Sequence, residues 1–108
     1  MRVLIDESLP VEIVGELPGF DTVTVHAQGW LHLRNGVLLR AAVRSGFSVL
    51  LTADSKLRYQ QNVSQFAIGV VVIETFDTTL PNLRMLLPKI KSAIESAIHG
   101  TITVIRPT

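Results

Sequence analysis

The chain has 108 residues, of which 47% are apolar, so it is the size of a single domain (residues 1–108) with a substantial core. It has no cysteine, which excludes disulfides, thiolate zinc sites and thiol catalysis and fits a reducing cytoplasm, and it has no apolar run of the roughly 18–20 residues that span a membrane. Without such a run, we expect no membrane partner. The net charge of +1 is nearly neutral, so any nucleic-acid contact requires a local patch.

The elements expected along the chain alternate between strands and helices. They are, in order, a strand at 2–5, a helix from Ser8 to about Leu17, a strand at 21–25, a helix at about 37–45, a strand at 47–52, a short helix at about 55–62, a strand at 69–73, a long helix from residues 78–81 to about Ile98, and a strand at 101–105. This order predicts an α/β fold, a three-layer α/β/α sandwich with a mostly parallel central sheet.

Caps and prolines mark the expected helices. Ser8 is the expected N-cap of the first helix, with Pro10 in its first turn, and Asn35 is the expected N-cap of the second. The last helix contains Pro88. An interior proline costs roughly 3 kcal/mol, so we expect a kink there or two abutting helices.

Acidic residues follow two of the expected strands. Asp6 and Glu7 come directly after the first strand, and Asp54 follows the third. Because ligands bind at the carboxyl ends of strands in open α/β sheets, we expect these carboxylates to meet at one edge. Such a set suits Mg²⁺ or Mn²⁺, which prefer oxygen ligands. Helix capping is the structural alternative for each acid.

Other side chains offer weaker candidates for the same chemistry. Further metal-binding acids are Glu74, at the end of the fourth strand, and Asp77 in the following turn, although both are also ordinary loop acids by position. Near Asp54, the candidates for contacting a phosphate backbone are Lys56, Arg58, Gln60, Gln61 and Asn62, with Tyr59 placed to stack on a base. The alternative is a polar helix with Leu57 and Tyr59 partly buried.

Several segments resemble one known family. The opening Met1 to Pro10, an apolar strand followed by Asp-Glu-Ser and Leu-Pro, is similar to the opening of a PIN-like family of small prokaryotic proteins. Leu50 to Asp54, with its Thr-Ala-Asp end, is the other specific match. The similarity covers nearly the whole chain through the weaker segments Val23-Thr24-Val25, Gly29-Trp30, Asn35 to Leu39 and Tyr59 to Asn62.

The resemblance implies a PIN-like fold and an Mg²⁺- or Mn²⁺-dependent ribonuclease. Relatives of this kind are often encoded as toxin components beside a small antitoxin, which implies RNA and a cognate antitoxin as partners. It assigns Asp6 and Asp54 as metal-binding acids, with Glu7 beside them. The family commonly has Asp-Gly-Glu where this chain has Asn35-Gly36-Val37, so Asn35 remains a weak oxygen ligand and a carboxylate is missing at Val37.

Three functions follow as alternatives. The first is a ribonuclease in which Lys56 or Arg58 steadies the scissile phosphate. The second, favoured by Val37, is a catalytically weakened or inactive PIN-like module that binds a protein or RNA. The third and weakest is a receiver-like phosphoacceptor domain that uses Asp54, although such a domain requires a lysine where this chain has Arg106. A homodimer is a further alternative, formed through the broad apolar stripe of the last helix around Leu83, Leu86 and Leu87.

Overall fold

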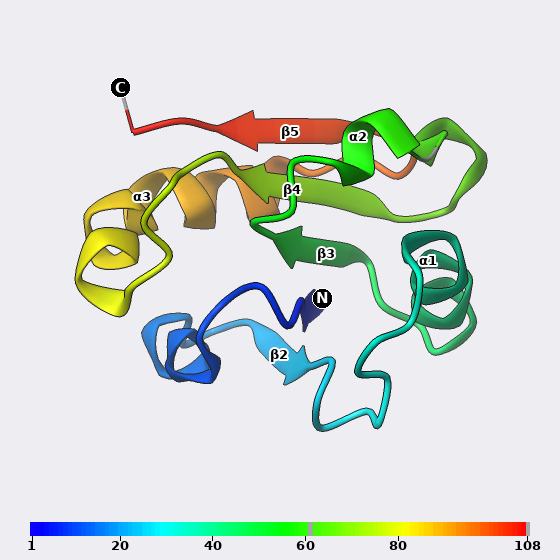
Figure 1. The fold of residues 1–108 in the computed structure, drawn as a ribbon, viewed down its shortest axis with the longest axis horizontal. Helices are drawn as coiled ribbons and strands as arrows, with labels where there is room; N and C mark the ends of the chain where they lie inside the picture. The colour runs from blue at the N-terminus through cyan, green and yellow to red at the C-terminus, as the bar shows by residue number, and fades with distance from the viewer. Residues whose placement is uncertain (61, 108) are drawn as a thin grey trace.

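In the computed structural model, which describes residues 1–60 and 62–107, five parallel strands form one sheet with helical segments on both faces (Figure 1). The strands are β1 (Arg2–Ile5), β2 (Asp21–Thr24), β3 (Val49–Thr52), β4 (Gly69–Ile73) and β5 (Ile102–Ile105). Their order across the sheet is β2-β1-β3-β4-β5, and every neighbouring pair is parallel. The prediction of an α/β sandwich is confirmed, with a sheet that is parallel throughout.

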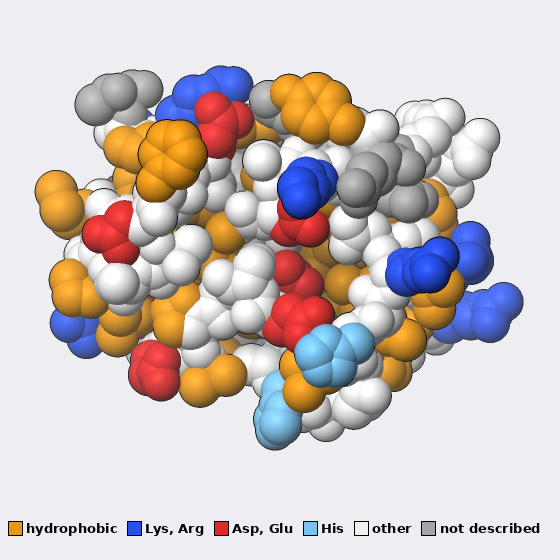
Figure 2. Space-filling model, in the orientation of Figure 1, with side chains coloured by type: hydrophobic (Ala, Val, Ile, Leu, Met, Phe, Trp, Pro, Cys, Tyr) orange, Lys and Arg blue, Asp and Glu red, His pale blue; other side chains and the backbone are white. Residues whose placement is uncertain are grey.

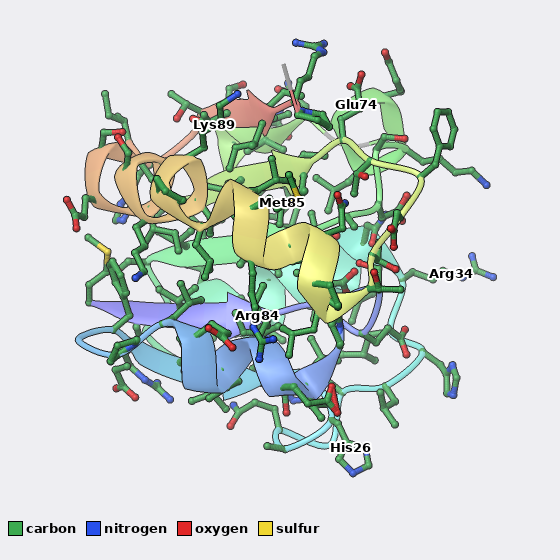
Figure 3. The ribbon with its side chains drawn as sticks, turned by 90° about the vertical axis from the view of Figure 1, so that its left-hand side faces the viewer. His26, Arg34, Glu74, Arg84, Met85 and Lys89 are labelled. Atoms are coloured by element: carbon green, nitrogen blue, oxygen red, sulfur yellow. The ribbon has the colours of Figure 1, made fainter. Side chains whose placement is uncertain are left out.

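The two faces of the sheet carry separate parts of the core. Successive side chains of a strand point to opposite faces. From β1, Val3 and Ile5 pack with the 3₁₀ helix η1 (Val11–Glu16) and the helix α3 (Leu80–Ser96). Leu4 packs on the other face, with α1 (Asn35–Arg44), α2 (Leu57–Gln60) and the 3₁₀ helix η2 (Val63–Gln65). Figure 3 shows α3 and η1 side by side in front of the sheet. Burying one large apolar side chain contributes about 1.5–3 kcal/mol, so both faces hold the strands in place.

The first helical segment is a 3₁₀ helix and not the α-helix expected from Ser8 to Leu17. Three of its six residues are β-branched and a fourth is Gly15, and both types are poor α-helix formers. The prediction that Ser8 is the N-cap is also wrong, because Pro10 holds that position. The Ser8 hydroxyl donates instead to the carboxylate of Asp6.

The second helix begins at Asn35 itself, so the prediction that Asn35 is its N-cap is wrong. Arg34 occupies that position, and its carbonyl accepts a hydrogen bond from the Leu38 N–H at 2.8 Å. Within the short helix expected over 55–62, the structure has α2 at Leu57–Gln60, and η2 is a separate 3₁₀ helix at Val63–Gln65.

The last helix, α3, runs through Pro88 as a single helix, so two abutting helices do not form. Pro88 is exposed, which leaves the carbonyl that lacks an N–H partner near water. Leu83 and Leu86 are buried in the core, so a homodimer face would have to use other residues. No helix of the described chain has the length and apolar character that crossing a bilayer requires.

The carboxyl ends of all five strands lie at one edge of the sheet, because every strand runs in the same direction. β1 and β3 are neighbours there, with Ile5 in register with Leu51. The Asp6 N–H continues this ladder, donating to the Leu51 carbonyl at 2.9 Å. The residue after β1 is thereby fixed beside the end of β3.

Candidate functional site

An open hollow at the carboxyl edge, which we call the acidic hollow, brings together the three acids that follow β1 and β3. Asp6, Glu7 and Asp54 line it, together with Asn35 and Arg34 from the start of α1. In Figure 2, acidic side chains gather in the middle of the viewed face, with a histidine beside them. The expectation that these acids meet at one edge is confirmed to the extent that they share one hollow.

The carboxylate of Asp6 is held by two hydroxyl groups. Its Oδ2 accepts hydrogen bonds from Thr52 Oγ1 at 2.8 Å and Ser8 Oγ at 2.6 Å. Each hydroxyl also accepts a backbone N–H, Thr52 from Asp54 and Ser8 from Ala53, both at 3.0 Å. A hydroxyl that donates once and accepts once has a fixed orientation. The network therefore orients Asp6 and ties the end of β1 to the segment after β3.

The same network leaves one side of the Asp6 carboxylate open. Thr52 is completely buried, so its bond to Oδ2 is shielded from water. Oδ1 of Asp6 receives no hydrogen bond from the residues that the structure describes, and Asp6 lines the hollow. That oxygen is available to a cation or to a hydrogen-bond donor on a ligand.

Glu7 links the end of β1 to the loop before α1. Its Oε1 accepts a hydrogen bond from the His32 backbone N–H at 3.3 Å, and Oε2 lies 4.0 Å from His32 Nδ1. His32 has a φ of +68°, an unusual conformation for a residue with a side chain. Glu7 thus holds the loop that forms one wall of the acidic hollow.

Asp54 caps the turn that leads into α2, as the structural alternative for this acid predicts, and it also lines the hollow. Its Oδ1 accepts the Lys56 N–H at 3.0 Å, and its carbonyl accepts the Leu57 N–H at 3.3 Å, at the start of α2. Within the described part of the chain, no donor reaches Asp54 Oδ2. Asp54, like Asp6, keeps one carboxylate oxygen for a ligand.

Glu74 and Asp77 line a second hollow, which we call the aromatic hollow because Tyr59 and Phe76 also line it. Glu74 forms an ion pair with Arg106 at 3.1 Å. Asp77 accepts hydrogen bonds from the Thr79 hydroxyl at 2.6 Å and from the Thr79 N–H at 2.9 Å. These two bonds hold the pKa of Asp77 below its ordinary value, and the bond from the hydroxyl has the larger effect. The structure does not bring Glu74 and Asp77 to Asp6 and Asp54.

The candidate phosphate-binding residues are dispersed. Lys56 is exposed and lies two residues after Asp54. Asn62 lines neither hollow, and its Oδ1 accepts a hydrogen bond from Ser64 Oγ at 2.5 Å. Gln61 lies outside the described residues, as does the side chain of Arg58.

Three contributors to the site were not among the sequence candidates: Ser8, Thr52 and Arg34. Arg34 lines the acidic hollow and extends away from the body of the protein (Figure 3). Thr52 had a detectable signal, because it is the single polar residue in the otherwise apolar strand Val49–Thr52.

The donor set fits a divalent ion held by few protein ligands. Within residues 1–60 and 62–107, no three acidic or histidine side chains form a group that could enclose a metal ion. Asp6 and Asp54 nevertheless both line the same hollow, and each has one carboxylate oxygen that accepts no hydrogen bond from the described residues. Mg²⁺ is usually bound through one or two carboxylates, while water and substrate phosphate complete its coordination. The chemistry of the two acids therefore suits Mg²⁺ or Mn²⁺.

Comparison with known proteins assigns no family to this chain: no family model, no curated protein and no solved structure matches it.

Proposed function

We propose that the protein is a PIN-like ribonuclease that depends on Mg²⁺ or Mn²⁺ and hydrolyses RNA phosphodiesters at the acidic hollow. The observation that carries the proposal is Asp6, oriented by Thr52 and Ser8 and sharing the hollow with Asp54. The resemblance of the opening and Thr-Ala-Asp segments to PIN-like relatives supports the same two acids. We further propose that it acts in the cytoplasm as the toxin of a toxin–antitoxin pair, with a cognate antitoxin as partner.

Asp6 and Asp54 would hold the cation through the oxygens that receive no hydrogen bond from the described residues. When bound, the ion supplies Lewis-acid stabilisation of the phosphate and a lowered pKa for water. Thr52 and Ser8 keep the Asp6 carboxylate in one orientation. Glu7 holds the loop around His32 and so shapes the wall of the hollow.

The basic groups around the acidic hollow suit the substrate phosphate. Arg34 lines the hollow, Lys56 is exposed just beyond Asp54, and α1 begins at the hollow with N–H groups that lack partners within the helix. In the reaction, a water oxygen bonds to phosphorus, the bond to the leaving ribose oxygen breaks, and that oxygen takes up a proton. These donors would position the phosphate for that displacement.

An RNA cleavage assay with Mn²⁺ tests the proposal. We expect wild-type protein to cleave single-stranded RNA and Asp6→Asn to lose nearly all activity, because the amide removes the charge that holds the cation. Glu95→Gln is the matched control, since Glu95 is exposed on α3 and lines neither hollow. Equal cleavage by wild type and Asp6→Asn, or no cleavage by either on varied RNAs, would reject the ribonuclease.

A second candidate is a module that binds RNA or a protein at the acidic hollow without hydrolysis. The first turn of α1 supports it, because Val37 there is 43% exposed and offers no ligand atom, where PIN-like relatives carry an acid. RNA binding by wild type without cleavage in Mn²⁺ would favour this candidate.

A further inference from the structure

The aromatic hollow has two exposed aromatic side chains that the proposed hydrolysis does not use. Tyr59 from α2 is 76% exposed, and Phe76 from the connection between β4 and α3 is fully exposed. Both line the same hollow. A single exposed apolar side chain is ordinary on a protein surface, but two aromatic rings at one hollow form a surface that suits a flat ligand.

The aromatic hollow adjoins the acidic hollow through one short stretch of chain. Asp54 lines the acidic hollow, while its neighbours Ala53 and Ser55 line the aromatic hollow. The Cα atoms of residues 53 and 55 are at most about 7–8 Å apart, because consecutive Cα atoms are 3.8 Å apart. A single flexible polymer can therefore occupy both hollows at once.

Hydrogen bonds hold the turn that carries Phe76. The Asp77 N–H donates to Thr75 Oγ1 at 3.1 Å, and Asn82 Nδ2 donates to the Asp77 carbonyl at 2.6 Å. With the two bonds from Thr79 to the Asp77 carboxylate, they fix both sides of the Phe76 backbone. The ring is thus presented to solvent by an ordered turn, which lowers the entropic cost of placing a ligand on it.

We propose that the aromatic hollow stacks an unpaired base of single-stranded RNA, next to the phosphate bound in the acidic hollow; the position of that phosphate rests on the proposed function. Stacking on Tyr59 or Phe76 requires a base whose face is exposed, which excludes bases paired within a duplex. The carboxylate of Asp77 disfavours a phosphate here, so the base and not the backbone faces this hollow. The substrate class is therefore single-stranded RNA.

Binding measured without cleavage tests this inference. A short labelled single-stranded RNA is titrated in EDTA and followed by fluorescence anisotropy. We expect Phe76→Ala and Tyr59→Ala each to weaken binding by about tenfold, and a duplex of the same sequence to bind more weakly than the single strand. The control is Met85→Ala, which removes an apolar side chain that is 80% exposed on α3 and lines neither hollow. Wild-type affinity in both aromatic variants, or duplex binding as tight as single-strand binding, overturns the inference.

A tryptophan reporter separates stacking from a structural effect of the substitution. We expect the indole of Phe76→Trp to be quenched when RNA is added, whereas the indole of Met85→Trp should not respond. Both variants share the background of Trp30, which packs edge-to-face against Phe47. Quenching without any cleavage would reject the ribonuclease and keep the stacking site. Cleavage without quenching, and without loss of affinity in Phe76→Ala, would reject stacking and keep the ribonuclease.

Discussion

Acids follow β1 and β4 at the same edge of one sheet, yet their carboxylates are used differently. After β1, Asp6 accepts a hydrogen bond from Thr52, which is 46 positions away in the chain. After β4, Asp77 accepts both of its carboxylate bonds from Thr79, two positions away. The first contact forms only when β1 and β3 are paired, whereas the second is part of a local turn. The orientation of Asp6 therefore depends on the folded sheet, whereas that of Asp77 depends on its own turn.

The two ends also differ in what surrounds them. Thr52 is buried and bridges Asp6 to the backbone of Asp54. Thr75, after β4, bridges the backbone of Asp77 and the side chain of Asn82 at a partly exposed position. A hydrogen bond contributes more where water cannot replace it. A buried partner such as Thr52 therefore holds an acid at a strand end more firmly than an exposed turn does.

The largest expected effect comes from removing the hydroxyl of Thr52, for which Thr75 provides the comparison. Thr52→Val should destabilise the protein by about 1–3 kcal/mol, because Asp54 N–H and Asp6 Oδ2 each lose a partner in a buried setting. It should also lower RNA cleavage by about 10–100-fold, since Asp6 loses one of the two hydroxyl groups that orient it. Denaturant unfolding and the Mn²⁺ cleavage assay measure the two effects.

The matched control is Thr75→Val at the other strand end. We expect it to cost less than about 1 kcal/mol of stability, because water can replace its hydroxyl. Thr52→Ser, which keeps the hydroxyl, should recover most of the lost activity. Equal losses of stability in the two valine variants would show that the end of β1 is no more than another turn.

Adding a carboxylate at position 37 tests whether the acidic hollow binds a cation. Val37→Glu places an acid in the first turn of α1, where the helix dipole favours it. Mn²⁺ should bind up to about tenfold more tightly, since a further charge near the ion at a protein surface contributes on the order of 1 kcal/mol. Calorimetric titration of Mn²⁺ measures the gain.

Ile98→Glu is the control for position 37. Ile98 is 67% exposed, and its carbonyl lies close to Gly69 at the start of β4, at the opposite edge of the sheet. The same acid added there should not change Mn²⁺ affinity. If both glutamates give the same affinity, then no cation binds beside α1.

The strands were predictable because their signals are local. The run Gly69–Ile73 has no alternation, and in the structure each of its residues is buried. Strand order was not readable from the chain, and it decides which acids meet. β3 lies next to β1, while β4 is one strand further away, so Asp54 joins Asp6 and Glu74 does not.

The helix starts were less predictable because tertiary partners compete for the capping residues. Ser8 has the side chain of an N-cap, but its hydroxyl donates to Asp6 and accepts from Ala53, and both contacts depend on β3 lying beside β1. The start of α1 differs from the predicted start by a small shift, because the helix begins at Asn35 and not after it. A sequence pattern indicates a capping side chain without naming its partner.

The smallest expected effect lies in the local turn after β4 and concerns pH. The Thr79 hydroxyl and N–H stabilise the charged form of Asp77, so the pKa of its carboxyl lies below the ordinary value of 3.8. Because the folded-state pKa is lowered, this contribution to stability is present above pH 3.8 and is lost as the pH falls through the folded-state pKa. Thr79→Val removes the hydroxyl and keeps the N–H, so the pKa of Asp77 should rise part of the way back.

An NMR titration of the Asp77 carboxyl measures that shift directly. The Thr79→Val protein should unfold more easily than wild type at neutral pH, and the difference should shrink as Asp77 becomes protonated. In an Asp77→Asn background nothing titrates at this position, so any effect of Thr79→Val there should not depend on pH in the acid range. An Asp77 titration that is identical with and without the Thr79 hydroxyl would show that this short-range contact does not hold the carboxylate. The contrast with Asp6 would then rest on burial alone.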